Sequence, residues 1–187
     1  MNSKRLKVLN SEIGRPIYIK KSPKSDNILI LNHKHELLLL DIKKDILQII
    51  DHSSNHTVQF NWSPDGNYIA YTCSKTPRVS IVKIYDLKNK KSFEVTDAIN
   101  NDYSPVFDDK GEYLAFISKR TFNPVYDSIQ FDLNFTRSEK PYIISLKKEI
   151  KSPFVKNIQP DTSLESKKNN KDKKKKDKSI NIKIDFN

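Results

Sequence analysis

Apolar residues gather along the chain in short runs rather than at the spacing of a helix. The runs are rich in Ile, Val, Leu, Tyr and Phe, and clusters of Pro, Asn, Asp, Gly and Lys separate them. Aromatic and β-branched residues favour strands, whereas the separating residues favour turns. The chain is therefore predicted to be all-β. The predicted strands share this composition and span residues 27–31, 36–41, 46–50, 68–73, 79–87, 93–96, 113–118 and 141–146.

A turn followed by an apolar strand occurs three times at a nearly constant spacing. The copies begin at Ser22, Ser63 and Asp108, so they lie 41 and 45 residues apart. In the middle copy, Ser-Pro-Asp-Gly at 63–66 suits a tight turn, because Pro presets φ, Asp bonds its own backbone and Gly adopts the left-handed conformation. A repeat of about 40–45 residues with about four strands is typical of the blades of a β-propeller.

The strand after each turn is apolar at consecutive positions, which indicates that both of its faces are covered. Trp62 and Phe107 stand directly before two of the turns, and we expect them to wedge between neighbouring blades. A β-sandwich built from similar hairpins is the alternative. The regular spacing of the repeats favours the propeller.

The sequence therefore predicts a partial β-propeller of about three four-stranded blades plus the first strand of a further blade. Residues 1–13 are the end of a preceding blade or an N-terminal extension, and residues 159–178 are a Lys-rich loop with the composition of disorder. Residues 179–187 alternate as the first strand of a truncated next blade would. The three blades have similar lengths and occupy residues 14–60, 61–104 and 105–158.

The third blade carries an aromatic insertion at residues 122–140. An insertion with this much apolar surface is expected to pack on a neighbouring blade, domain or subunit. Three blades also leave two apolar faces and unpaired strand edges, which favour association. We therefore expect the chain to require further blades or a partner chain.

The basic charge is concentrated near the C-terminal end. Of the net charge of +11, residues 147–187 contribute +7, from 13 Lys and 6 acidic residues, and the first 146 residues contribute only +4. The run Lys167–Lys178 contains no Arg and no aromatic residue, so it lacks the groups for bidentate phosphate recognition and base stacking. A solvated loop is the preferred interpretation, and nucleic-acid, anionic-lipid or acidic-protein binding is the alternative.

Several classes of chemistry are disfavoured by single residue types. One cysteine, Cys73, excludes an intramolecular disulfide and a Cys-cluster zinc site, and its apolar strand indicates a buried thiol rather than a nucleophile. Three glycines cannot form a glycine-rich nucleotide loop, so no cofactor is predicted. The apolar run at 37–40 is too short to cross a bilayer, and the start Met1–Lys7 is not followed by a signal-type apolar segment, so a cytoplasmic location is expected.

Histidines form the one group that could suggest a metal site. His33 and His35 are predicted to alternate on one face of a strand, and His52 and His56 follow in a loop. No carboxylate or cysteine completes the usual ligand spacing, so surface and turn positions are preferred over a zinc site.

Neighbouring carboxylates are interpreted in the same way. Asp108 and Asp109, and likewise Asp127 and Asp132, are expected to cap turns rather than to act as acid and base. No Gly-x-Ser-x-Gly nucleophile motif is present. No catalytic, metal or cofactor-binding residue is assigned from the sequence.

Four motifs between about Gly14 and Phe154 resemble the second, seven-bladed propeller of the tricorn proteases and their bacterial homologues. The insertion, Ser-Lys-Arg-Thr-Phe-Asn-Pro-Val-Tyr-Asp at 118–127 followed by Phe-Asp-Leu-Asn-Phe at 131–135, is the most specific of them. Pro141-Tyr142 and Ser152–Phe154 follow it. The other three motifs lie at residues 32–41, 62–71 and 105–114.

The resemblance implies a part of a cytoplasmic serine peptidase that trims oligopeptides released by larger proteases. In this family the propellers filter and conduct peptides, and the catalytic Ser, His and Glu lie in C-terminal domains beyond the propeller. None of those catalytic motifs matches this chain, so whether it is itself an enzyme is left open. The implied role is a non-catalytic segment whose partners are oligopeptides and the remainder of the protease or a partner chain. The alternatives are a stand-alone interaction module and, more weakly, a basic nucleic-acid-associated protein.

Overall fold

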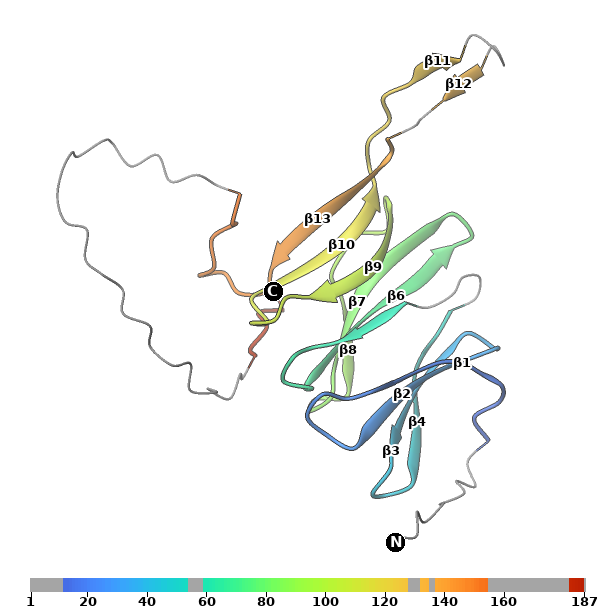
Figure 1. Ribbon diagram of the computed structural model, residues 1–187, viewed down its shortest axis with the longest axis vertical. Helices are drawn as coiled ribbons and strands as arrows, with labels where there is room; N and C mark the ends of the chain where they lie inside the picture. Colours follow the sequence, from blue (N-terminus) through green and yellow to red (C-terminus); the bar gives the residue numbers. More distant parts are fainter. Residues whose placement is uncertain (1–11, 54–58, 128–131, 135–136, 155–181, 187) are drawn as a thin grey trace, which may run out of the picture.

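The computed structural model describes residues 12–53, 59–127, 132–134, 137–154 and 182–186. Every element assigned within these residues is a β-strand (Figure 1), which confirms the predicted all-β class. The predicted Lys-rich loop at 159–178 lies outside the described residues. Residues 179–181 and 187 of the segment 179–187 also lie outside the described residues.

Two antiparallel sheets each contain four strands that pair in chain order. The first sheet consists of β1 (Pro16–Lys21), β2 (Asn27–Asn32), β3 (Glu36–Asp41) and β4 (Ile46–His52). The second consists of β5 (Phe60–Trp62), β6 (Tyr68–Thr76), β7 (Val79–Asp86) and β8 (Lys91–Glu94). Sequential pairing through short turns is the meander of a propeller blade.

The third sheet has three strands among the described residues. They are β9 (Asn101–Phe107), β10 (Tyr113–Lys119) and β13 (Glu139–Ser145), in the order β13-β10-β9. Residues 147–154 form turns and bends after β13, and no strand is assigned to residues 182–186. The exact blade boundaries, and the further strand at 179–187, stay predictions.

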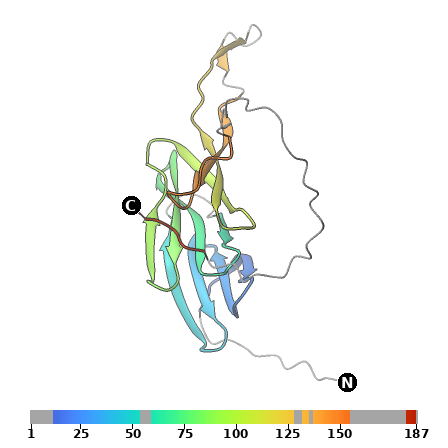
Figure 2. The same cartoon turned by 90° about the vertical axis from the view of Figure 1, so that its left-hand side faces the viewer.

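The three sheets stack side by side, and the second lies between the other two (Figures 1 and 2). Along β6, alternate side chains point to opposite neighbours. Ile69, Tyr71 and Cys73 pack in one core cluster with Leu29 and Leu31 of the first sheet. Both faces of the second sheet are therefore buried, which explains its consecutive apolar residues.

The opposite face of the second sheet packs on the third. Ala70, Val82 and Ile84 share a second core cluster with Leu114 and Phe116 of β10. The two residues predicted to wedge between blades do so, because Trp62 is 5% exposed in the first cluster and Phe107 is 6% exposed in the second.

The repeated turns have the predicted geometry. Gly66 has a φ of 72°, and its N–H donates to the Ser63 carbonyl at 2.9 Å. Asp65 accepts the Ser63 hydroxyl at 2.6 Å and the Asn67 N–H at 3.1 Å. In the next copy of the turn, Asp108 accepts the N–H groups of Glu112 and Tyr113 at 2.7 and 2.8 Å. These carboxylates close the turns before the second strands of the second and third sheets.

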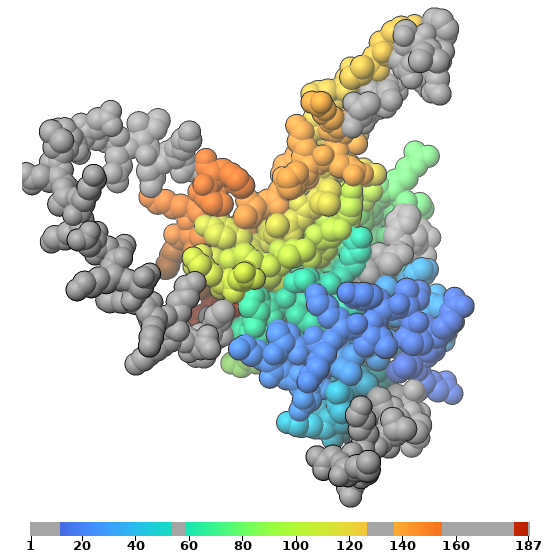
Figure 3. All heavy atoms as spheres, viewed as in Figure 1, coloured from blue at the N-terminus to red at the C-terminus, as the bar shows by residue number. Residues whose placement is uncertain are grey.

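The insertion forms a separate hairpin of β11 (Val125–Asp127) and β12 (Asp132–Asn134). It projects away from the three sheets (Figures 1 and 3). Phe122, Val125 and Tyr126 are 64%, 53% and 62% exposed. The expected packing of this insertion on a neighbouring domain or subunit stays a prediction.

Candidate functional site

The first strand of each sheet lies at a sheet edge, and together these edges border an apolar groove. The groove has a volume of about 400 Å³. Ile17 and Tyr18 of β1, Phe60 of β5, and Pro105 and Val106 of β9 line it. The groove therefore runs across all three sheets on the side of their first strands.

Large apolar side chains remain open to solvent along this groove. Ile17 and Tyr18 are 52% and 54% exposed, and Val106 is 49% exposed. The Tyr18 ring packs against the Phe60 ring, with 5.3 Å between the centroids. β1, β5 and β9 are the first strands of their sheets, so this apolar surface lies along the first-strand edges.

Two hydrogen bonds hold the walls of the groove together. The Gln59 side-chain oxygen accepts the backbone N–H of Ser104 at 2.7 Å and its hydroxyl at 2.9 Å. Ser104 has a φ of 54°, and Pro105 follows it without an N–H, so the ladder between β9 and β10 shifts register near this point. β1 is the edge strand of the first sheet, so one side of its backbone pairs with no strand among the described residues.

Cys73 lies in the core between the first and second sheets and is 6% exposed. Burial raises the pKa of its thiol. A buried, protonated thiol is a poor nucleophile. This position agrees with the interpretation of Cys73 as a core residue.

The histidines are placed differently from the prediction. His33 and His35 lie in the turn between β2 and β3 and not on one face of a strand, because β2 ends at Asn32 and β3 begins at Glu36. The Asn32 carboxamide oxygen accepts the N–H groups of Lys34 and Glu36, both at 3.0 Å, and closes this turn. The first residues of the motif at 32–41, which resembles the tricorn family, therefore form the turn of the β2–β3 hairpin.

The other metal and acid–base candidates also lie apart from the groove. His52 ends β4, His56 is outside the described residues, and Asp127 pairs in register with Asp132 in the projecting hairpin. Asp108 caps a turn, and Asp109 is exposed beside it. Within the described ranges, no group of three His, Cys, Asp or Glu residues is close enough to hold a metal ion.

A partly buried polar network that the sequence did not indicate joins the first two sheets. Asp51 of β4 accepts the Tyr71 hydroxyl and the Lys83 ammonium, both at 2.9 Å. The Tyr71 hydroxyl also lies 2.8 Å from the Ser92 hydroxyl. No spacing in the sequence relates these residues, because they come from four different strands.

A second network lies where the insertion leaves the third sheet. Asp102 is completely buried and accepts hydrogen bonds from the Ser118 hydroxyl and from Arg120 Nη2, the latter at 3.0 Å. The Arg120 guanidinium lies over the Tyr142 and Phe116 rings, 4.8 and 5.7 Å from their centroids. This stacking fixes the start of the insertion on the third sheet.

The Asp51 network predicts a loss of stability in acid. Half-burial alone would raise the pKa of Asp51, but hydrogen bonds from Lys83, Tyr71 and the His52 N–H hold the pKa below its ordinary value. A carboxyl with a lowered pKa stabilises the fold above its unfolded-state pKa of about 3.9, and this contribution is lost as the pH falls through the folded-state pKa.

We expect Asp51→Asn to lower the melting temperature near neutral pH and to reduce its further fall below about pH 4. Thermal unfolding followed by circular dichroism from neutral pH downward measures both effects. The exposed Asp109→Asn substitution is the control. If the melting temperatures of the native chain and of Asp51→Asn fell equally below about pH 4, Asp51 would not be the source of the acid sensitivity.

Stacked antiparallel sheets with their first strands along one groove define this protein as a partial β-propeller. The crystal structure of the tricorn protease is similar over 77% of this chain, with a TM-score of 0.71 and 21% sequence identity. The match covers 15% of that longer chain. Among the described residues, no helix is long and apolar enough to span a membrane.

The family is shown by sequence comparison. The family described as tricorn protease second beta propeller domain matches residues 1–187, so this chain belongs to it. A putative tricorn-like protease C-terminal subunit from Sulfurisphaera tokodaii is 35% identical over 84% of this chain. A tricorn protease homolog from Saccharolobus solfataricus is 32% identical over 75% of it. The chain spans 18% and 13% of the lengths of these two relatives.

Proposed function

We propose that this chain is a non-catalytic part of a tricorn-type serine peptidase and that its first strands contact oligopeptides on their way to a catalytic domain. The observation that carries the proposal is the open apolar groove along β1, β5 and β9, with Ile17, Tyr18 and Val106 about half exposed. Apolar side chains left open on the channel side of a propeller are suited to transient contact with peptides.

The chemistry of the groove supports contact rather than cleavage. Its walls combine apolar side chains with the edge of β1, and an extended peptide can use both without reacting. In this proposal the catalytic residues come from other parts of the longer protein, and the whole protein acts in the cytoplasm on oligopeptides from larger proteases. The small share of each relative that this chain spans is consistent with such a division.

A stand-alone interaction module is the second candidate, and the projecting hairpin favours it. Phe122, Val125 and Tyr126 expose apolar surface away from the sheets. Such surface commonly marks a protein-binding site. Sedimentation of the purified chain separates the candidates, because a discrete, well-folded oligomer of this chain alone would support the interaction module.

Peptide contact in the groove is tested with Tyr18→Asp. We expect a labelled decapeptide of alternating Val and Thr to bind about tenfold more weakly to this variant, because the new charge would be desolvated beneath the peptide. Fluorescence anisotropy measures the affinity, and peptide-induced NMR shifts at Ile17 and Val106 locate the site. The matched control is Ile99→Asp, since Ile99 is 77% exposed and lies outside the groove.

Equal binding by Tyr18→Asp and the native chain, or shifts confined to other residues, would refute contact in the groove. The purified chain is also expected to release no fluorophore from a fluorogenic oligopeptide. Turnover that persists through repeated purification would show that the chain is itself catalytic.

A further inference from the structure

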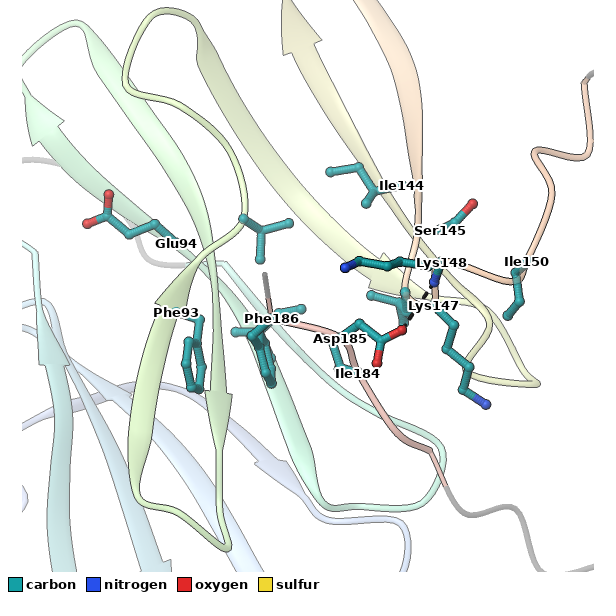
Figure 4. A pocket seen from close by; sticks show the side chains of 13 residues that line it. Phe93, Glu94, Ile144, Ser145, Lys147, Lys148, Ile150, Ile184, Asp185 and Phe186 are labelled. Carbon is teal, nitrogen blue, oxygen red and sulfur yellow. Dashed lines mark hydrogen bonds between the residues drawn. The ribbon is translucent and has the colours of Figure 1, made fainter.

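Residues 182–186 lie between β8 of the second sheet and the end of β13 in the third (Figure 4). Ile184 and Phe186 pack on the core cluster that joins these two sheets. A cleft of about 530 Å³ stays open beside them, with Phe93 and Ile144 in its lining. The segment thus contacts both sheets, and we call residues 182–186 the clasp.

The first anchor of the clasp is Ile182, which is 3% exposed. Its N–H donates to the Asp65 carboxylate at 2.9 Å. Its side chain lies so close to Gly111 that a methyl group there would overlap Ile182 Cδ1 and Cγ1. Asp65 and Gly111 belong to the repeated turns of the second and third sheets. The missing side chain of Gly111 therefore makes room for the clasp between the two turns.

The second anchor is Asp185, which binds the residues after β13 through both its backbone and its side chain. Its N–H donates to the Leu146 carbonyl at 3.0 Å, and its carboxylate accepts the Lys148 N–H at 3.2 Å. The second bond requires a side-chain acceptor at this position. Directional bonds therefore select the clasp in addition to apolar contact.

The third anchor is Phe186. Its ring stacks on the Phe93 ring of β8, with 3.8 Å between the centroids and an interplanar angle of 13° (Figure 4). The Tyr68 ring lies 6.3 Å from it at an angle of 55°. Aromatic pairs of this kind contribute more than the area that they bury. Together the anchors define a short motif, Ile-x-x-Asp-Phe.

The clasp is held differently from the strands around it. No strand is assigned to residues 182–186, so separate bonds hold the clasp rather than a continuous ladder. Lys183 and Asp185 are exposed, and the open cleft borders the clasp. An element with few backbone bonds and an exposed side opens at a lower cost in free energy than the sheets beneath it.

We propose that the seam between the second and third sheets is a peptide-binding site for the motif Ile-x-x-Asp-Phe. Residues 182–186 are its intramolecular ligand, and they can leave the seam while the sheets stay folded. When bound, the clasp ties the turn and the outermost strand of the second sheet to the third sheet. The proposal is independent of peptide contact in the groove, because the residues that line the groove include none of these anchors.

Competition by a separate peptide tests the proposal. A fluorescent peptide of residues 179–187 is added to the native chain and to Ile182→Asp, in which a new carboxylate beside Asp65 expels the clasp. We expect fluorescence anisotropy to show at least about tenfold tighter binding to Ile182→Asp, because the native clasp occupies its own site. Lys183→Asp, the matched control, introduces the same residue at an exposed position and should bind the peptide as weakly as the native chain.

Amide hydrogen exchange followed by NMR tests the site in the full chain. The Ile182 and Asp185 amides should exchange at least about tenfold more slowly than in the free peptide. Gly111→Ala should abolish this protection, because the methyl group takes the place of Ile182. Gly14→Ala is the matched control, since both glycines have a φ of 66° but Gly14 precedes the first sheet. Protection of the Ile84 amide reports whether the sheets stay folded.

A variant in the clasp itself avoids any change to the turns. Phe186→Ala removes the stacking on Phe93 and should speed exchange of the Asp185 amide by about tenfold, with Ile84 unaffected. Loss of Ile84 protection in Phe186→Ala would show that the segment is part of the core and not a detachable clasp.

Other results would also overturn the proposal. Equal peptide binding by the native chain and Ile182→Asp, or binding by neither, would show that the clasp does not occupy a peptide site. Equal binding of a peptide that itself carries Ile182→Asp would show that the motif is not recognised. Exchange of the Ile182 amide at the free-peptide rate would show that the clasp is not bound. Protection that rises with protein concentration, together with sedimentation as a dimer, would assign the site to the clasp of a second copy.

Discussion

Replacing Tyr71 by alanine is expected to lower the free energy of unfolding by about 4 kcal/mol, because the change removes a large, fully buried aromatic side chain and leaves a cavity. Tyr71 is 0% exposed and packs between the first two sheets with Leu31 and Trp62. Its hydroxyl also holds Asp51 at 2.9 Å. Urea unfolding followed by circular dichroism measures the change.

The matched variant Tyr71→Phe separates packing from hydrogen bonding. It keeps the ring and removes only the hydroxyl, so we expect a loss of about 1–2 kcal/mol. Asp51 then retains its bond to the Lys83 ammonium at 2.9 Å. Similar losses for Tyr71→Phe and Tyr71→Ala would show that the network, and not the packing of the ring, holds these sheets together.

Removing the carboxylate of Asp102 is expected to cost about 3 kcal/mol, because a buried charge pair that loses one partner leaves the other uncompensated. Asp102 is completely buried, whereas the side chain of Arg120 is 35% exposed, so solvent compensates part of the loss. The Ser118 hydroxyl also loses its acceptor. Asp102→Ala is measured by urea unfolding.

Two controls accompany Asp102→Ala. Asp109→Ala removes an exposed carboxylate from the same sheet and should leave stability within about 0.5 kcal/mol of the native value. Arg120→Met keeps much of the side-chain length over the Tyr142 ring and removes the charge. If Asp102→Ala cost no more than Asp109→Ala, the network would not stabilise the third sheet.

The repeat and its turns could be predicted from the sequence because their determinants are local. Ser-Pro-Asp-Gly at 63–66 and the residues after Asp108 specify turns through backbone preferences that need no tertiary contact. The apolar runs of β2, β3, β6 and β7 could also be predicted, because a strand covered on both faces is apolar at consecutive positions, and this is visible in the sequence.

The first strand of each sheet was missed by the strand prediction. β5 spans only Phe60–Trp62, β1 begins with Pro16 and ends with two lysines, and β9 contains Ser104 and Pro105. β1 and β9 combine exposed side chains along the groove with polar residues and prolines, and β5 is too short to show a repeating pattern. Prolines and polar residues lower the apparent propensity of an edge strand.

The polar networks could not be predicted at all. Asp51, Tyr71 and Lys83 meet because adjacent sheets are stacked at a particular register, and that register depends on the whole core. The alternation of residues continues past Asn32 and so predicts a strand through His33 and His35. The hydrogen bonds from the Lys34 and Glu36 N–H groups to Asn32 end the strand there, and residue alternation does not indicate them.

The two junctions between sheets carry different chemistry. The first joins Asp51 to Tyr71 and Lys83, whereas at the second the Ser80 hydroxyl donates to the backbone carbonyl of Asp102 at 2.8 Å. Each unit thus matches its own neighbour, although all three repeat one strand pattern. The contacts between neighbouring sheets therefore favour the order in which the three sheets occur in the chain. A duplicated or transposed unit would bring together surfaces that do not match.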